Sequence, residues 1–357
     1  MLSSHDRLKV IFIIGLSFLG IEIMSQVVMA YQINIKCQFL INPIFLNLDY
    51  EKKSQMCNDL KSLKYNVADI RLNEPNQHYA TININSEGFR GEEFAKVKGD
   101  DEFRIAVVGS SMIFGLGSTS DETTIPSILQ KKMNTVDEKI TVINAGIIAA
   151  NSASETYLIK NILPQYDPDL IIVYEGYNDS FNIPIPDVRI GISQKEVKRT
   201  NFEKFVKNNF DMFATPKLVY QKTHDYFEIH ETNEIDIKEN AQLWKKRWKE
   251  TCVSQDQIPI IILMQPVVGA GEKPLTLEES HLLNSEKHHS ILTVFETLVS
   301  ASKELEPFCE QIYDITGIFD YTNEHVYVTS AHLTDNGNAI IAQKMFDVLS
   351  PFLNKDF

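Results

Sequence analysis

Residues 104–115 read Arg-Ile-Ala-Val-Val-Gly-Ser-Ser-Met-Ile-Phe-Gly. The first half of this run is apolar and rich in β-branched residues, which predicts a short buried strand. The strand breaks at a turn of small residues, Gly109-Ser110-Ser111, and a helix is predicted to start there. At the start of a helix the backbone N–H groups point outward, toward any ligand. Ser111 is therefore a candidate nucleophile.

The pattern of a short apolar run followed by a helical stretch continues along the chain. The predicted strands are 104–108, 140–144, 169–174, 258–264 and 311–315, and the predicted helices are 122–134, 151–163, 234–251, 279–304 and 336–350. Such alternation predicts parallel strands that are buried on both faces, with helices on both sides of the sheet. We therefore predict an α/β domain with three layers, α/β/α, and a five-stranded parallel sheet.

Polar or small residues that could take part in a reaction follow several of these strands. Ser111, Gly146 and Asn178 each come just after a predicted strand, and His332 follows the last strand by a loop. Right-handed crossovers bring the carboxyl ends of the strands to one edge, where open α/β sheets bind ligands. We expect these four residues to converge at that edge.

The four residues match the needs of ester hydrolysis by a serine. Such a reaction requires a base for the hydroxyl proton and donors that hold the developing oxyanion. His332 is the predicted base. The N–H groups of Ser111 and Gly146 and the side-chain amide of Asn178 are the predicted oxyanion donors. Ser111 and His332 are thus the predicted catalytic pair.

The surrounding motifs resemble those of the SGNH (GDSL-like) hydrolase family, which is named after its serine, glycine, asparagine and histidine. The matching residues are Gly109-Ser110-Ser111 with Phe114-Gly115, Asn144-Ala145-Gly146, Gly176-Tyr177-Asn178-Asp179, and His332-Leu333-Thr334-Asp335 with Gly337-Asn338. Residues 84–90, Ile-Asn-Ser-Glu-Gly-Phe-Arg, also resemble a segment before the first strand of membrane-anchored members. The resemblance covers roughly residues 80–350 and implies the flavodoxin-like SGNH fold and a serine hydrolase of ester bonds.

One position departs from the family pattern. The family usually has an aspartate three residues before the histidine, and this chain has Thr329 there. The aspartate orients the imidazole and stabilises its charged form, and its removal from a serine protease costs ~10⁴ in kcat. Three interpretations stay open. A Ser–His dyad, with the ring held by a main-chain carbonyl or by Thr329, has precedent in the family; Glu324 or Asp320 replaces the acid; or the chain is a weak or lost hydrolase.

Composition excludes some classes of function. The chain has 357 residues, of which 43% are apolar, so it can bury a sizeable core. Its formal net charge of −14 argues against a nucleic-acid partner, because phosphate neutralisation needs surplus Lys and Arg. The basic run Lys245-Lys246-Arg247 is flanked by Trp244 and Trp248 and followed by Lys249, which predicts a helix with the tryptophans packed inward.

The amino terminus predicts a membrane anchor or a cleaved signal segment at residues 1–30. An apolar stretch, Val10–Ile21, is interrupted at Glu22 and Gln26 before it resumes. Its twelve uninterrupted residues suit a signal-peptide core, whereas the count through to Ala30, about 21 residues, is enough to span a membrane. A buried helix of a soluble domain is the alternative. Both the anchor and the cleaved signal place the residues after Tyr31 outside the cytoplasm. The anchor would keep the protein on a membrane, and the cleaved signal would leave it secreted.

The remaining chain is predicted to have two parts. Residues 31–100 have no clean periodicity and are predicted to lead from the membrane segment into the domain. Residues 101–357 are predicted to form the hydrolase domain. Residues 180–235 interrupt the strand–helix alternation and are predicted to be a lid or a substrate-shaping segment.

Four cysteines allow three disulfide pairings. Cys252 and Cys309 each follow a helical stretch and precede a predicted strand, so we predict Cys252–Cys309 and Cys37–Cys57. No C-x₂-C or H-x₃-H spacing is present, so neither a metal nor a cofactor is expected. His288-His289 lies in a charged helical stretch and is expected to be exposed.

The predicted reaction is hydrolysis of an acyl ester of an envelope carbohydrate or lipid, through an acyl-Ser111 intermediate. An O-acyltransferase with the same residues would pass the acyl group to a sugar hydroxyl instead of to water. A binding protein that kept the fold and lost turnover is the non-enzymatic alternative.

Overall fold

The computed structural model describes residues 4–35, 48–67, 69–181, 237–255, 257–283 and 286–353. The chain divides into two compact units, which consist of residues 1–38 with 194–233 and of residues 39–193 with 234–357.

Helix α1 (Ser4–Ile35) is the element described in the first unit. None of the described helices combines the length and the apolar character that a membrane crossing requires. The membrane anchor or signal segment predicted for residues 1–30 and the location outside the cytoplasm stay predictions.

The described part of the second unit is built on a five-stranded parallel sheet with the order β6-β5-β7-β8-β9. The strands are β5 (Phe103–Gly109), β6 (Ile140–Gly146), β7 (Leu170–Glu175), β8 (Ile260–Met264) and β9 (Gln311–Asp314). Every residue of β7 and β8 is buried, as expected of strands covered on both faces. The predicted α/β fold with a five-stranded parallel sheet is confirmed, and the strand order is the flavodoxin-like one.

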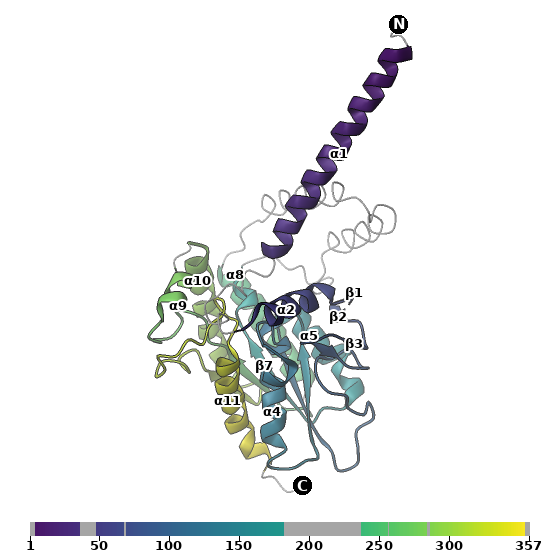
Figure 1. The fold of residues 1–357 in the computed structure, drawn as a ribbon. Coiled ribbons are helices and arrows are strands. Elements are labelled where there is room, and N and C mark those ends of the chain that lie inside the picture. The colour runs from purple at the N-terminus through teal and green to yellow at the C-terminus, as the bar shows by residue number, and fades with distance from the viewer. Residues whose placement is uncertain are drawn as a thin grey trace. The chain divides into compact units, whose positions relative to one another are not determined.

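Helices cover both faces of the sheet (Figure 1). One face carries α4 (Ile125–Met133) and α11 (Asp335–Leu353), and the other carries α5 (Ser152–Asn161), α8 (Ile237–Ser254) and α10 (Glu286–Ser302). Alternate residues of β5 divide between the two cores. Ile105 and Val107 pack with α4 and α11, whereas Ala106 and Val108 pack with α5 and α8. The predicted three layers are therefore present.

The described residues before the sheet belong to the same compact unit as the sheet. Their elements are α2 (Tyr50–Ser62), β1 (Tyr65–Val67), β2 (Arg71–Asn73), β3 (Gln77–His78) and β4 (Asn83–Ile84). Ile84 and Phe114, both fully buried, share one hydrophobic cluster. This segment thus packs against α3 (Ser111–Phe114), the short helix that carries Ser111. The boundary predicted at residue 101 has no counterpart in the division of the chain.

Short helical turns complete the second unit. They are η3 (Asp121–Thr123), η4 (Leu163–Tyr166), η5 (Asn178–Phe181), α9 (Leu277–Leu283) and η6 (Lys303–Leu305). The insertion predicted at residues 180–235 lies outside the described residues, apart from Ser180 and Phe181.

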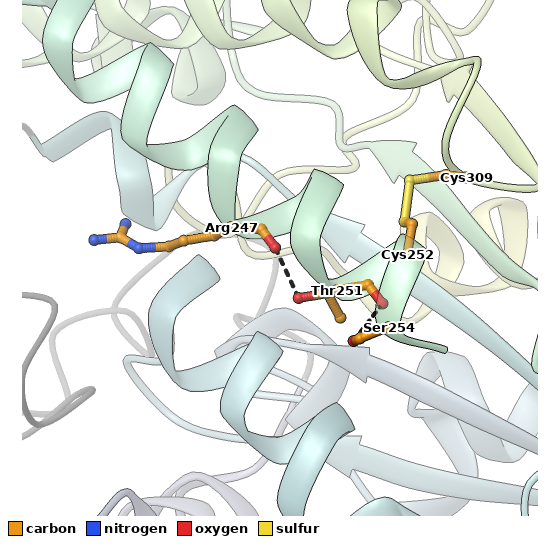
Figure 2. Close-up of a disulfide and its surroundings, with 5 residues drawn as sticks. All are labelled: Arg247, Thr251, Cys252, Ser254 and Cys309. Atoms are coloured by element: carbon orange, nitrogen blue, oxygen red, sulfur yellow. Dashed lines mark hydrogen bonds between the residues drawn. A yellow bond between two sulfur atoms is a disulfide. The ribbon is translucent and has the colours of Figure 1, made fainter. Parts of the chain in front are cut away.

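A disulfide joins Cys252 in α8 to Cys309, just before β9 (Figure 2). This pairing confirms the prediction, since the strands that follow the two cysteines, β8 and β9, are neighbours in the sheet. The last turn of α8 beside it is held by the hydroxyl of Thr251, which donates to the carbonyl of Arg247. Cys57 is also disulfide-bonded, but the predicted pairing with Cys37 lies outside the described residues.

Two predictions about side-chain burial had opposite outcomes. Trp244 and Trp248 are fully buried, which confirms that they pack inward. His288 was expected to be exposed and is buried instead, with Nε2 at 2.8 Å from the carbonyl oxygen of Val268. The prediction was wrong because it relied on the charged residues near His288 in the sequence, whereas His288 lies on the buried face of α10.

Candidate active site

Ser111 is the first residue of α3, directly after β5. The helix ends at Gly115, whose φ of +94° lies in the left-handed region that glycine adopts without steric cost. The first N–H groups of a helix have no acceptor inside it. The turn therefore presents both the hydroxyl and the N–H of Ser111 at the carboxyl edge of the sheet.

His332 contacts the hydroxyl of Ser111 across 221 residues of sequence: Ser111 Oγ and His332 Nε2 are 2.8 Å apart. His332 sits in a tight loop that is closed by pairing between Tyr327 and Leu333. The N–H of Val328 also donates to the carbonyl of His332 at 2.7 Å. The structure thus brings the predicted nucleophile and the predicted base into direct contact.

Thr329 lies on the other side of the imidazole. Its Oγ1 is 2.7 Å from His332 Nδ1 and accepts the main-chain N–H of His332 at 3.2 Å. A base needs an unprotonated Nε2, which places the ring proton on Nδ1, where Thr329 accepts it. The threonine hydroxyl can therefore orient the ring as a carboxylate would, but it supplies no negative charge.

Glu324 and Asp320 do not contact the ring. Within the described residues, neither is a hydrogen-bond partner of His332. Glu324 is exposed and accepts from Asn336, and Asp320 Oδ1 accepts the N–H of Glu272 at 2.8 Å. Of the interpretations left open by the sequence, the geometry matches the one in which Thr329 holds the ring.

Burial lowers the pKa of His332 to about 4, below the ordinary value of about 6.5. The residue keeps some solvent exposure, yet the ring lies deep enough for lost solvation to oppose its charged form. Without a hydrogen-bonded carboxylate, little offsets that loss. The ring is thus neutral and able to accept a proton at physiological pH, but it is a weak base.

Gly146 does not present a free donor. Its N–H donates to Asn144 Oδ1 at 3.1 Å in the buried interior. A Cβ on Gly146 would lie 2.1 Å from the backbone nitrogen of Phe114 and 2.6 Å from the carbonyl carbon of Ile113. The predicted role as an oxyanion donor is therefore corrected to a packing role, because only glycine lets α3 pack this closely on β6.

The loop after β6 offers a different donor, Ala149. This residue is exposed and has a φ of +63°, in the left-handed region that non-glycine residues rarely adopt. Within the described residues no acceptor is present for its N–H. Strained backbone of this kind clusters at functional sites. Sequence reasoning missed Ala149 because its side chain carries no chemistry, and only the backbone marks it.

Asn178 lies against the same loop. It begins η5, after β7, and its Nδ2 donates to the carbonyl of Ala150. That bond uses one of the two amide N–H groups and leaves the other for a ligand. Asp179 fixes the junction next to it by accepting the N–H of Ser152 at 2.7 Å and the hydroxyl of Ser152. The loops after β6 and β7 are therefore held together.

Two further carboxyl groups are buried behind this junction. Burial raises the pKa values of Glu155 and Glu175 well above the ordinary range, and the nearby Asp179 raises them further. Arg247 Nη1 lies 3.9 Å from Asp179 Oδ1. Burial and the neighbouring carboxylate thus both favour the protonated form of Glu155 and Glu175. Among the described residues, no group of three or more His, Cys, Asp or Glu side chains is arranged to hold a metal ion.

Comparison with known proteins finds similarity in structure only. No family model and no curated protein matches the sequence. An acetyl xylan esterase, AlAXEase, shares 12% identity at a TM-score of 0.41 over 69% of this chain and 100% of that chain. A putative lipolytic protein of the G-D-S-L family from Desulfitobacterium hafniense shares 13% at 0.40, over 70% and 100%.

The lipase/acylhydrolase from Enterococcus faecalis shares 14% identity at a TM-score of 0.40, over 71% of this chain and 99% of that chain. Similarities this low carry no argument about activity. The function proposed below therefore rests on the geometry of the chain itself.

Proposed function

We propose that the chain is a serine esterase that cleaves an acyl ester through an acyl-Ser111 intermediate. The observation that carries this proposal is the 2.8 Å contact between Ser111 Oγ and His332 Nε2, with Thr329 on the opposite ring nitrogen. A nucleophile in contact with a base, which is in turn oriented by a third group, is the arrangement that activates a serine hydroxyl.

These contacts support the following reaction. His332 Nε2 accepts the hydroxyl proton as Ser111 Oγ bonds to the ester carbonyl carbon. The tetrahedral intermediate collapses, the bond to the alcohol breaks, and the imidazolium returns its proton to that alcohol. Water then attacks the acyl carbon with His332 again as the base. The bond from that carbon to Ser111 Oγ breaks, the imidazolium returns its proton to Oγ, and the free acid leaves. Thr329 keeps the ring aligned through both steps.

We propose three donors for the oxyanion. They are the N–H of Ser111, the N–H of Ala149 and the free amide N–H of Asn178. Removal of one such donor typically costs ~10²–10³ in rate, so the set accounts for much of the acceleration available to a site with a weak base.

We also propose that the domain works outside the cytoplasm, on an acylated carbohydrate or lipid. The Cys252–Cys309 disulfide supports this location, because disulfides persist mainly in oxidising compartments. The surplus of acidic residues supports an uncharged or weakly charged substrate over a polyanion.

A panel of substrates tests the activity and its type. Acetylated sugars, lysolipids and short p-nitrophenyl esters are each incubated with the protein, with and without free sugar as an acceptor. Release of free acid identifies an esterase. Transfer of the acyl group to the sugar in preference to water identifies an O-acyltransferase. No turnover of any ester, with no acyl adduct on Ser111, contradicts the proposal and leaves a binding protein.

The pH profile reports how His332 is held. Because the neutral ring is the active form, kcat/KM of the wild type is expected to fall as the pH drops through about 4. Thr329→Asp adds a negative charge beside Nδ1, which favours the charged ring and should move this acid limb toward about pH 6–7. A stronger base should also raise kcat by about tenfold or more.

Thr329→Asn is the matched control for this shift, since it has nearly the shape of aspartate and no charge. Its acid limb should stay near that of the wild type. Two results would contradict this account of the ring. One is a wild-type acid limb at the ordinary histidine pKa, and the other is an equal shift of the limb in Thr329→Asp and Thr329→Asn.

The two remote carboxylates are expected to be dispensable. Glu324→Gln and Asp320→Asn should each leave kcat/KM within a few-fold of the wild type, since neither side chain contacts His332. Steady-state kinetics at neutral pH provide the measurement. A loss of about 10³ or more in one variant would identify that residue as the acid of a triad.

A further inference from the structure

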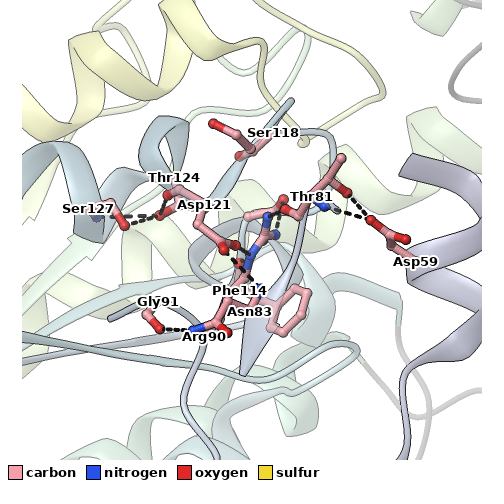
Figure 3. Close-up of polar contacts among 12 residues, drawn as sticks. Asp59, Thr81, Asn83, Arg90, Gly91, Phe114, Ser118, Asp121, Thr124 and Ser127 are labelled. Atoms are coloured by element: carbon pink, nitrogen blue, oxygen red, sulfur yellow. Dashed lines mark hydrogen bonds and ion pairs between the residues drawn. The ribbon is translucent and has the colours of Figure 1, made fainter. Parts of the chain in front are cut away.

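The guanidinium of Arg90 lies at the C-terminal end of the helix that carries Ser111 (Figure 3). Its Nη1 donates to the carbonyl oxygens of Phe114 and Gly115, at 3.2 and 2.8 Å. Carbonyls at the end of a helix lack intrahelical partners, and a cation there also interacts favourably with the helix dipole. Arg90 is buried, so water does not compete for these carbonyls.

Two other segments hold the guanidinium in place. Arg90 Nε donates to Asp121 Oδ1 at 2.7 Å, and Nη2 donates to the carbonyl of Thr81 at 2.9 Å (Figure 3). Asp121 is itself fixed, because its Oδ2 accepts the N–H of Asn83 at 2.8 Å. The Phe114 ring lies over the guanidinium at 5.1 Å. The position of the cation is therefore determined from several sides at once.

A turn of the backbone delivers Arg90 to this place. Asn85 Oδ1 accepts the N–H groups of Glu87 and Phe89, at 3.1 and 3.0 Å, and Gly88 has a φ of +88°. These are the residues of the 84–90 motif, and none of them takes part in the proposed reaction. The motif thus builds a rigid support that ends in the Arg90 side chain.

Helix α3 depends on such support because it is only four residues long. Short helices are unstable without tertiary contacts. A misplacement of about 1 Å in a catalytic group can cost ~10² in rate. We infer that Arg90 is a positioning residue, which holds α3 so that Ser111 Oγ faces His332. The inference rests on the proposed function for its kinetic consequence, but not for its structural one.

Arg104 offers a matched control. It is also a buried arginine, and it donates to the carbonyls of Lys96 and Tyr166, both at 2.9 Å. It pairs with Glu102 at 2.7 Å, as Arg90 pairs with Asp121. However, Arg104 lies near the start of β5, and a strand of that length places it about 20 Å from Ser111.

The experiment compares Arg90→Lys with Arg104→Lys in the full chain. Each variant keeps the charge and loses the planar fork that binds several acceptors, so both should lower the midpoint of thermal unfolding. At a temperature where both are folded, Arg90→Lys should lower kcat by about 10–100-fold with KM within a few-fold. Arg104→Lys should keep kcat within a few-fold. Equal losses in kcat would overturn the inference.

Amide hydrogen exchange tests the positioning without any turnover. Arg90→Lys should speed exchange in residues 111–116 more than in residues 152–161, and Arg104→Lys should not. If the wild type cleaves no ester, the proposed function fails, and unchanged exchange in residues 111–116 would then overturn the positioning role separately. Asp121→Asn, which weakens the hold on Arg90 and keeps its side chain, should show the same pattern in milder form and decides the question if Arg90→Lys does not fold.

Discussion

Ser111→Ala is expected to lower kcat for ester cleavage by a factor of about 10³–10⁵. The range follows from the cost of losing the serine and from the rate already lost without a triad carboxylate. Removal of the serine from a complete triad costs about 2 × 10⁶ in kcat. The missing carboxylate already forfeits up to ~10⁴ of that rate, and the hydroxyl of Thr329 recovers the part that comes from orienting the ring. His332→Ala should have a loss of similar size, because the hydroxyl is a poor nucleophile without its base.

The double variant separates a cooperating pair from two independent residues. If Ser111 and His332 act as a unit, Ser111→Ala/His332→Ala should be no slower than Ser111→Ala alone. Initial rates with an excess of p-nitrophenyl acetate provide the measurement. Ser110→Ala is the matched control, since Ser110 Oγ contacts Met112 Sδ at 3.4 Å and not the imidazole. Losses that multiply in the double variant would argue against shared chemistry.

Gly146→Ala is expected to lower kcat by about 100-fold or more and to destabilise the domain by about 3 kcal/mol. A Cβ at this position would lie 2.1 Å from the backbone nitrogen of Phe114. The backbone of α3 cannot yield as the end of a flexible side chain could, so the whole helix must move. Ser111, at the start of that helix, then loses its alignment with His332.

This variant also decides between the two roles considered for Gly146. Alanine keeps the backbone N–H, so a residue that served only as an oxyanion donor would tolerate it with near-normal rates. Thermal unfolding and steady-state kinetics are measured together, with Gly99→Ala as the control. At Gly99 the new Cβ would meet its nearest neighbour, Glu102 Cβ, at an ordinary 3.6 Å. A stable and fully active Gly146→Ala protein would contradict the packing role.

The core of the fold was predictable because each strand has a recognisable local sequence pattern. The β-branched runs around Val107, Ile172 and Ile262 mark strands buried on both faces, and the helices between them require parallel connections. That topology alone brings Ser111 and Asn178 to one edge of the sheet. The Cys252–Cys309 disulfide was predictable for the same reason, since its cysteines precede neighbouring strands.

The predictions failed or fell short where backbone geometry decides the outcome. The N–H of Gly146 donates to Asn144 Oδ1, and the feature that distinguishes Ala149 is its positive φ. Residue types alone therefore could not point to Ala149, which we propose as a donor. The contact between Thr329 and the ring depends on the shape of the loop that the pairing of Tyr327 with Leu333 closes, and residue types do not specify that shape. The role of Arg90 was not predicted for a related reason, because its acceptors are three main-chain carbonyls and the carboxylate of Asp121, spread over residues 81–121.

The central claim is that Ser111 is a nucleophile activated by His332. Labelling of the folded protein with a fluorophosphonate probe, followed by mass spectrometry of the peptide that contains residues 104–115, tests it most directly. We expect one adduct, on Ser111, which also forms in Ser110→Ala and disappears in Ser111→Ala and after heat unfolding. An unlabelled wild type, or a Ser111→Ala variant labelled as strongly as the wild type, would contradict the claim.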